Sequence, residues 1–422
     1  MIFNIGMLTI SNIAVRFLGM VYKVWLSQAI SPVALGIFQL SMSVYMVLIT
    51  PVASGLPNAV SRLSAKYMKQ GHAGAVLLSG LKIGAAVTVF SGAVMLAGCG
   101  FLASAFLHEK TAWCVILALI PAVTLGALAS LPAAYLHAHE KSSYPAVFEI
   151  IEQISKILFG IAVISLFASG NTSQDAALAA LAVSFGGVLS FIMLFACCGK
   201  IKKTGPDYTR ELLQNALPPT LSRFATTLLH LGTTTILPLG LMAWGLSKEA
   251  ALSQYGILTS MAYPVVYMPL TVIGALCVVL LPEVAKNLGD YVRLKQKFSR
   301  AMFFALSISL LFSLLLLLFA PAAARIIFHQ PLAGTFMVML IPSVLFSGLN
   351  QVSGTMLNGL GRQKRLMINN IIDGCLGLLL TYLLVWRFGI YGFVVGNCIQ
   401  DILAFLMNFS SAVHFIKKEK QS

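Results

Sequence analysis

Apolar blocks of about 20 residues or more, separated by short polar stretches, follow one another along the whole chain. A helix needs about 20 apolar residues to cross a hydrocarbon core of about 30 Å. Strands of an outer-membrane barrel alternate apolar and polar side chains, and these blocks do not. Only 10% of the residues are charged, against about 25% in soluble domains. The sequence therefore predicts an all-α polytopic membrane protein.

Twelve transmembrane helices account for these blocks. We expect two parallel six-helix lobes around a central cavity, one over residues 1–203 and one over 204–422. The expected helices are 2–26, 34–57, 74–106, 111–136, 144–168, 176–198, 212–243, 251–281, 300–327, 333–358, 366–386 and 390–415. The loops between them are connectors, too short to form a domain.

Lysine and arginine are distributed unequally between the two sets of loops. One set holds 19 of the 28, including Lys200, Lys202, Lys203 and Lys420, whereas the opposite set holds four. Because short cytoplasmic loops carry the excess of Lys and Arg, both termini are expected in the cytoplasm. The net charge of +15 is then a topology signal that faces anionic membrane lipids, and no nucleic acid is expected as a partner.

An internal repeat supports the two-lobe interpretation. Residues 119–152 align without gaps to residues 340–373 with 8 identities in 34 positions, and His108 falls opposite His329 at the same offset. The offset corresponds to six helices, an even number, so both halves should have the same orientation in the membrane. Parallel halves of this kind bracket a central cavity in transporters.

Two arginines lie deep inside predicted helices. Arg16 and Arg223 are 11 to 14 residues from their helix starts, or about 16 to 21 Å at about 1.5 Å per residue. A charged residue inside the bilayer usually faces a cavity or a partner. Two interpretations stay open: each guanidinium is neutralised by a buried carboxylate, or it contacts an anionic substrate in the cavity, since its planar fork matches phosphate. Lys23 and Lys82, by contrast, are expected to extend their ammonium groups into the headgroup region.

The helix predicted over 144–168 carries three ionisable residues on one face, Glu149, Glu152 and Lys156. Glu152 and Lys156 have the favourable Glu-before-Lys spacing of a helical ion pair. Asp373 falls opposite Glu152 in the internal repeat and has no partner at helical spacing. Either the pair is static, or these four residues couple or gate transport. The histidines and cysteines form no metal-site pattern, and no cofactor is expected.

Several ordered segments resemble a known family. Arg16-Phe-Leu-Gly-Met-Val-Tyr-Lys23, Leu35-Gly-Ile-Phe-Gln39 and the run from Ser54 to Leu63 are similar to the opening of stage V sporulation protein B and its oligosaccharide-flippase relatives. The stretches Phe148–Lys156 and Met356–Lys364 resemble later patterns of that family. It belongs to a superfamily that also holds lipid II flippases and multidrug and toxin extrusion transporters. Members often have fourteen helices, whereas twelve are expected here.

The resemblance implies a flippase in a bacterial cytoplasmic membrane that moves a polyprenyl-pyrophosphate-linked sugar or a related cell-envelope precursor by alternating access. Arg16 and Arg223 would then contact the anionic, lipid-linked substrate. The alternative is a cation-coupled multidrug exporter of the same superfamily. An intramembrane enzyme is not expected, because the outer loops offer only His108–Lys110 and the segment from Arg325 to His329.

Overall fold

The computed structural model describes residues 2–141, 143–199, 201 and 205–418, and over these residues it contains helices and no strand. The chain divides into two compact units, unit 1 over residues 1–231 and unit 2 over residues 232–422. The division falls inside the long helix α10. The predicted boundary between residues 203 and 204 lies outside the described residues, as do Lys200, Lys202, Lys203 and Lys420, and it stays a prediction.

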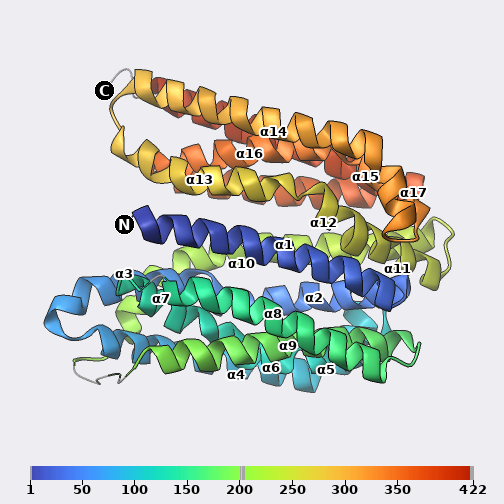
Figure 1. Cartoon of the computed structure of the whole chain (residues 1–422), viewed down its shortest axis with the longest axis horizontal. Coiled ribbons are helices and arrows are strands. Elements are labelled where there is room, and N and C mark those ends of the chain that lie inside the picture. Colours follow the sequence, from blue (N-terminus) through green and yellow to red (C-terminus); the bar gives the residue numbers. More distant parts are fainter. Residues whose placement is uncertain (1, 142, 200, 202–204, 419–422) are drawn as a thin grey trace. The chain divides into compact units, whose positions relative to one another are not determined.

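Unit 1 is built from long helices joined by short helical segments. Helices α8 and α9 pack side by side, and α1 packs on α8 (Figure 1). The elements are α1 (Ile2–Ala29), α2 (Pro32–Ala53), α3 (Gly55–Tyr67), η1 (Met68–Gln70), α4 (Ala73–Phe101), η2 (Leu102–Phe106), η3 (Lys110–Ala112), α5 (Trp113–Ala118), α6 (Ile120–Thr124), η4 (Gly126–Ala129), α7 (Ser130–Ala138), α8 (Ser143–Phe167), α9 (Thr172–Cys197) and the first part of α10 (Thr209–Ala243).

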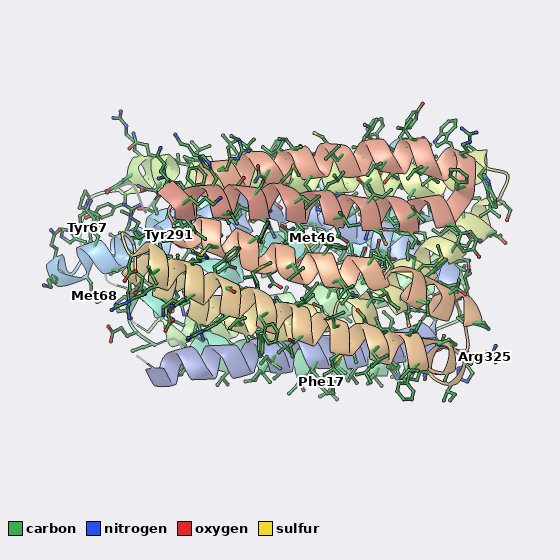
Figure 2. The ribbon with its side chains drawn as sticks, turned by 90° about the horizontal axis from the view of Figure 1, so that it is seen from above. Phe17, Met46, Tyr67, Met68, Tyr291 and Arg325 are labelled. Atoms are coloured by element: carbon green, nitrogen blue, oxygen red, sulfur yellow. The ribbon has the colours of Figure 1, made fainter. Side chains whose placement is uncertain are left out.

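Unit 2 is also built from long helices joined by short helical segments. Helix α16 packs against α13, α14 and α17 (Figure 1), and Tyr291 and Arg325 lie at opposite ends of α14 (Figure 2). Its elements after α10 are α11 (Lys248–Gly256), η5 (Ile257–Ala262), α12 (Tyr263–Val266), α13 (Pro269–Lys286), α14 (Tyr291–Ile326), α15 (Pro331–Met339), α16 (Ile341–Gly359) and α17 (Gln363–Lys418).

The prediction of an all-α polytopic membrane protein is confirmed. In the described part of the chain, nine helical segments are long and apolar enough to cross a membrane, and a tenth forms if the bent pair α15 and α16 is one span. Gly389 has a non-helical backbone that divides α17 into two helices, and α1 carries Arg16 and Lys23 in 28 residues. Counting both, each of the twelve predicted segments falls on helix.

Three expected segments differ locally from the prediction. The connector expected after Pro57 is largely helical, because Leu56, Ala59, Val60 and Leu63 line one buried face of α3. The single helices expected over 111–136 and 251–281 are each broken into short pieces. Prolines explain part of this, since proline at the first turn of α6 and of α13 favours a new helix start at those points.

The internal repeat recurs in the local backbone of each unit. The break between α5 and α6 at Leu119 corresponds to the break between α15 and α16 at Leu340. His108 and His329, which the alignment also pairs, have φ angles of 54° and 52°. Few residues other than glycine adopt such angles. The same unusual conformation at two aligned histidines shows that the two halves share their turn geometry as well as their sequence pattern.

The segment 205–212, which leads into α10, is held against the turn between α3 and α4 within unit 1. Asp207 accepts hydrogen bonds from Ser79 (3.2 Å) and from the amide of Thr209 (2.9 Å), and Lys82 lies 3.4 Å from its other oxygen. The hydroxyl and amide of Thr209 lower the pKa of the Asp207 carboxyl well below its usual range. Lys82 therefore binds a carboxylate of this segment, and the headgroup position expected for it stays a prediction.

Aromatic and apolar contacts complete this attachment. The ring of Tyr208 lies 4.6 Å from that of Tyr67, centroid to centroid, and its hydroxyl is 2.9 Å from Nδ1 of His72. Leu212 is fully buried in the core of unit 1. Glu211 accepts from Lys66 at 2.9 Å. Contacts of Asp207, Tyr208, Glu211 and Leu212 thus fix the beginning of α10 to α3, to α4 and to the turn between them.

Candidate functional site

Arg16 and Arg223 occupy matching positions in their helices. Each lies fourteen residues after the first residue of its helix, Ile2 in α1 and Thr209 in α10. That distance is about 21 Å along each helix axis. Both arginines are exposed in unit 1, and neither side chain makes a hydrogen bond or ion pair to another described residue. Phe17, beside Arg16, is half exposed on α1 (Figure 2).

The half of α10 that carries Arg223 packs tightly on α2 and α3. Gly55 lies so close to α10 that an added Cβ would be 2.2 Å from the carbonyl oxygen of Ala216. Thr50 and Thr227 approach to 3.4 Å through their hydroxyl groups. Thr227 also donates to the carbonyl of Arg223 itself. Contacts above and below it along α10 therefore fix the position of the Arg223 backbone within unit 1.

Helix α1 lies along α8 in a close seam lined by glycines. The hydroxyl of Ser11 donates to the carbonyl of Ala146 at 2.6 Å. Gly19 faces the side chain of Gln153, and Gly160 faces the hydroxyl of Tyr22. Since the contacts advance together along both helices, α1 and α8 run parallel. We call the residues along these contacts the α1–α8 seam.

The ionisable face of α8 meets α1, α2 and α9 in the same region. Glu152 accepts a hydrogen bond from Ser190 of α9, and its charge interacts with that of Lys156. Both side chains pack over Gly186. The ammonium of Lys156 lies 5.9 Å from the ring centroid of Tyr22. No ion pair within 4.0 Å joins Glu152 to Lys156 among the described residues, so the observed state is not a closed helical salt bridge.

Lys23 also belongs to this cluster. It lies close enough to Lys156 for the two positive charges to interact, and its side chain is only partly exposed. The headgroup position expected for Lys23 stays a prediction. The sequence carried a signal for this arrangement: Arg16 and Lys23 are seven residues apart, which places them on one face of α1. Glu149, the third charge of α8, is exposed and interacts electrostatically with Glu152.

Unit 2 contains a separate carboxylate cluster. Gln400 donates to the backbone carbonyl of Asp373 at 3.2 Å, whereas the Asp373 Oδ1 is buried without a partner among the described residues. The charge of Asp373 interacts with that of Asp401. Asp401 in turn accepts from Asn397 at 3.3 Å and from hydroxyl groups that include Ser343. Sequence reasoning singled out Asp373 but did not pair it with Gln400 or Asp401, because these residues follow the helix break at Gly389 and spacing within one helix gives no signal for them.

The structure thus places the predicted residues in three groups. Glu149, Glu152 and Lys156 come together on α8, Arg16 and Arg223 stand exposed on α1 and α10, and Asp373 belongs to the cluster of unit 2. Among the described residues, no group of three or more His, Cys, Asp or Glu side chains could hold a metal ion. Whether these groups act on a substrate stays a prediction.

Comparison with protein family models shows to which family this chain belongs. The family model described as polysaccharide biosynthesis protein matches residues 2–288, and a second model, MatE, matches residues 227–383. The chain belongs to the polysaccharide biosynthesis protein family. The resemblance found in the sequence motifs is thereby confirmed.

Curated relatives of this family member include two proteins of Bacillus subtilis (strain 168). Stage V sporulation protein B is 23% identical over 418 residues, which cover 94% of this chain and 80% of the relative. Lipid II flippase MurJ is 22% identical over 450 residues, which cover 95% of this chain and 80% of the relative. The similarity extends over nearly the whole chain in both cases.

Solved structures show the same fold for this family member. An inward-facing multidrug resistance MATE family transporter of the MOP superfamily has a TM-score of 0.76 at 17% identity, and covers 98% of this chain and 99% of its own. A MOP superfamily transporter from Pyrococcus furiosus has a TM-score of 0.73 at 16% identity, covering 99% and 96%. The helical architecture is therefore that of MOP superfamily transporters.

Proposed function

We propose that this protein is a flippase that moves a polyprenyl-pyrophosphate-linked sugar or a related cell-envelope precursor across a bacterial cytoplasmic membrane by alternating access. The observation that carries the proposal is the pair of exposed arginines at equal depth in α1 and α10, within a chain of the polysaccharide biosynthesis protein family. An exposed guanidinium inside the bilayer needs an anion, and pyrophosphate accepts its two-pronged hydrogen bonds. Lipid II flippase MurJ supports this class of cargo by its similarity.

A cation-coupled multidrug exporter is the second candidate, and the MATE family structures favour it by fold. Fold alone does not set function. The carboxylates of unit 2, Asp373 and Asp401, would suit an organic cation, but Asp401 already accepts a hydrogen bond from Asn397. Arg16 and Arg223 repel such a cargo. No catalytic role is proposed, and the protein acts without chemical change to its cargo.

Reconstitution into liposomes tests the function. Purified protein should move a fluorescent polyprenyl-pyrophosphate-linked sugar between leaflets at least tenfold faster than protein-free liposomes do, as measured by enzymatic access to the sugar from outside. A polyprenyl-linked sugar without the pyrophosphate should move hardly faster than in protein-free liposomes, because it carries no group that the two arginines can bind. Transport of ethidium with no movement of the lipid-linked sugar would assign the chain to the exporter class.

The orientation and the lobes belong to the same proposal. Both termini face the cytoplasm, the loop at residues 169–175 faces outward, and the lobes over 1–203 and 204–422 flank a central cavity. The support is the unequal distribution of Lys and Arg. In a variant without its seven cysteines, Thr172→Cys should react with an impermeant maleimide on intact cells and Thr204→Cys should not. The opposite labelling pattern would reverse the topology.

A further inference from the structure

Two buried hydrogen-bond donors in the α1–α8 seam have no partner. Tyr22 and Gln153 are 4% and 7% exposed, and the Tyr22 hydroxyl and the Gln153 Nε2 bond to nothing among the described residues. Leaving such a group buried and unpaired is unfavourable, and native proteins leave few of them. Tyr22 lies against Gly160 and Gln153 against Gly19, so both donors belong to one seam.

The two lysines of the seam also lack a close counter-ion. Among the described residues, no carboxylate oxygen lies within 4.0 Å of the Lys23 or the Lys156 ammonium. The positive charges of Lys23 and Lys156 interact with each other. Two neighbouring ammonium groups in a region of low dielectric repel each other unless an anion lies between them. This pair of ammonium groups therefore favours a negatively charged ligand.

We propose that the seam binds a phosphate group at Lys23, Lys156 and the hydroxyl of Tyr22. The ammonium of Lys156 is already 5.9 Å from the Tyr22 ring centroid, on the side chain whose hydroxyl is unpaired. The inference rests on the proposed function, because it takes the pyrophosphate of the cargo as the ligand.

The site lies beyond Arg16 along the same face of α1. Lys23 follows Arg16 by seven residues, or about 10 Å along the helix axis. A pyrophosphate held first by Arg16 would reach Lys23 by moving two turns along α1. The seam is thus a second phosphate position, further from the first residue of α1 than the arginine position.

Tyr22→Phe separates a ligand role from a structural role. Since the hydroxyl bonds to no residue that the structure describes, a purely structural tyrosine should tolerate its removal. We would titrate inorganic pyrophosphate into the detergent-solubilised full chain by calorimetry, in an Arg16→Gln, Arg223→Gln background that removes the arginine position. Adding Tyr22→Phe should lower the affinity about tenfold, and Lys156→Gln at least tenfold, with an unchanged or raised thermal midpoint for Tyr22→Phe.

Tyr382→Phe is the matched control, because Tyr382 is half exposed in unit 2. Its pyrophosphate affinity should equal that of the background. If the Tyr22→Phe and Lys156→Gln proteins bind pyrophosphate as tightly as the Arg16→Gln, Arg223→Gln background does, or if the wild type binds none, the phosphate site is overturned. Neither result bears on the flipping assay, which tests the proposed function separately.

Phosphate in a membrane comes from the cargo or from ordinary lipids, and two further titrations distinguish them. Farnesyl pyrophosphate represents the cargo, and dihexanoyl phosphatidylglycerol represents an anionic phospholipid. A loss of affinity with Tyr22→Phe for farnesyl pyrophosphate supports the cargo site. A loss seen with the phospholipid alone would overturn the assignment to cargo.

Discussion

Replacing both Arg16 and Arg223 by alanine should lower lipid-linked sugar flipping by about a hundredfold or more. A hydrogen bond to a charged group contributes about 1.5 to 3 kcal/mol, and each arginine offers two such bonds to pyrophosphate. Each single Arg→Ala protein should lose at least about tenfold. Arg→Lys should fall in between, since lysine keeps the charge but not the planar fork. The measurement is the initial flipping rate in liposomes at equal protein density.

Folding should survive these substitutions. Neither arginine makes an ion pair or a side-chain hydrogen bond to another described residue, so its removal leaves no buried partner unpaired. Size-exclusion elution and the thermal midpoint should therefore match the wild type. Arg325→Ala is the matched control, because Arg325 is exposed at the far end of α14 (Figure 2). Wild-type flipping by both single Arg→Ala proteins would refute the role of the pair.

Exchanging the charges of α8, with Glu152→Lys and Lys156→Glu in one protein, should abolish flipping while leaving expression normal. A permanent ion pair would tolerate the exchange. We propose instead that Glu152 and Lys156 pair in one state and that Glu149 or Asp373 competes for Lys156 in the other. The observed state agrees with alternation, since Glu152 is bonded by Ser190 while the Lys156 ammonium lies over Tyr22. We expect flipping to fall at least about tenfold, because each exchanged charge then lies beside groups that were arranged for the opposite charge.

The exchanged pair Lys66→Glu with Glu211→Lys provides the control. These side chains form a surface ion pair at 2.9 Å with 57% and 32% side-chain exposure, and such pairs contribute about 0 to 1 kcal/mol. Their exchange should leave the flipping rate within about twofold of the wild type. A Glu152/Lys156 exchange that flips cargo at the wild-type rate would instead support a permanent pair.

The sequence predicted the fold well because apolar block length is a direct measure of membrane crossing. The break at Gly389 was also visible, since the predicted helices end at 386 and resume at 390. The short helical pieces around Leu119 and Leu340 were not, because their hydropathy equals that of a continuous helix. Helix α3 was missed for the opposite reason: its buried face is narrow, and its other residues read as a polar connector.

Candidate site residues were predictable one helix at a time. The spacing of Glu149, Glu152 and Lys156 placed them on one face, and they do lie together. Spacing within a helix says nothing of which neighbouring helix supplies Ser190, Tyr22 or Lys23, since that depends on packing. The glycines at 19, 160 and 186, which permit the close packing of α1, α8 and α9, have no distinct pattern in the sequence.

The attachment of residues 205–212 to α3 and α4 determines where the covalent connection between the two units can bend. Asp207, Tyr208 and Leu212 anchor this segment to unit 1, so it does not act as a flexible linker. The covalent connection from unit 1 to unit 2 is the continuous helix α10. Any displacement of one unit against the other must therefore bend helix α10. Pro238 supplies a weak point just past the division at residues 231 and 232, since it removes the helical hydrogen bond to Thr234. The elastic resistance of this one helix would then set part of the energy barrier between conformations.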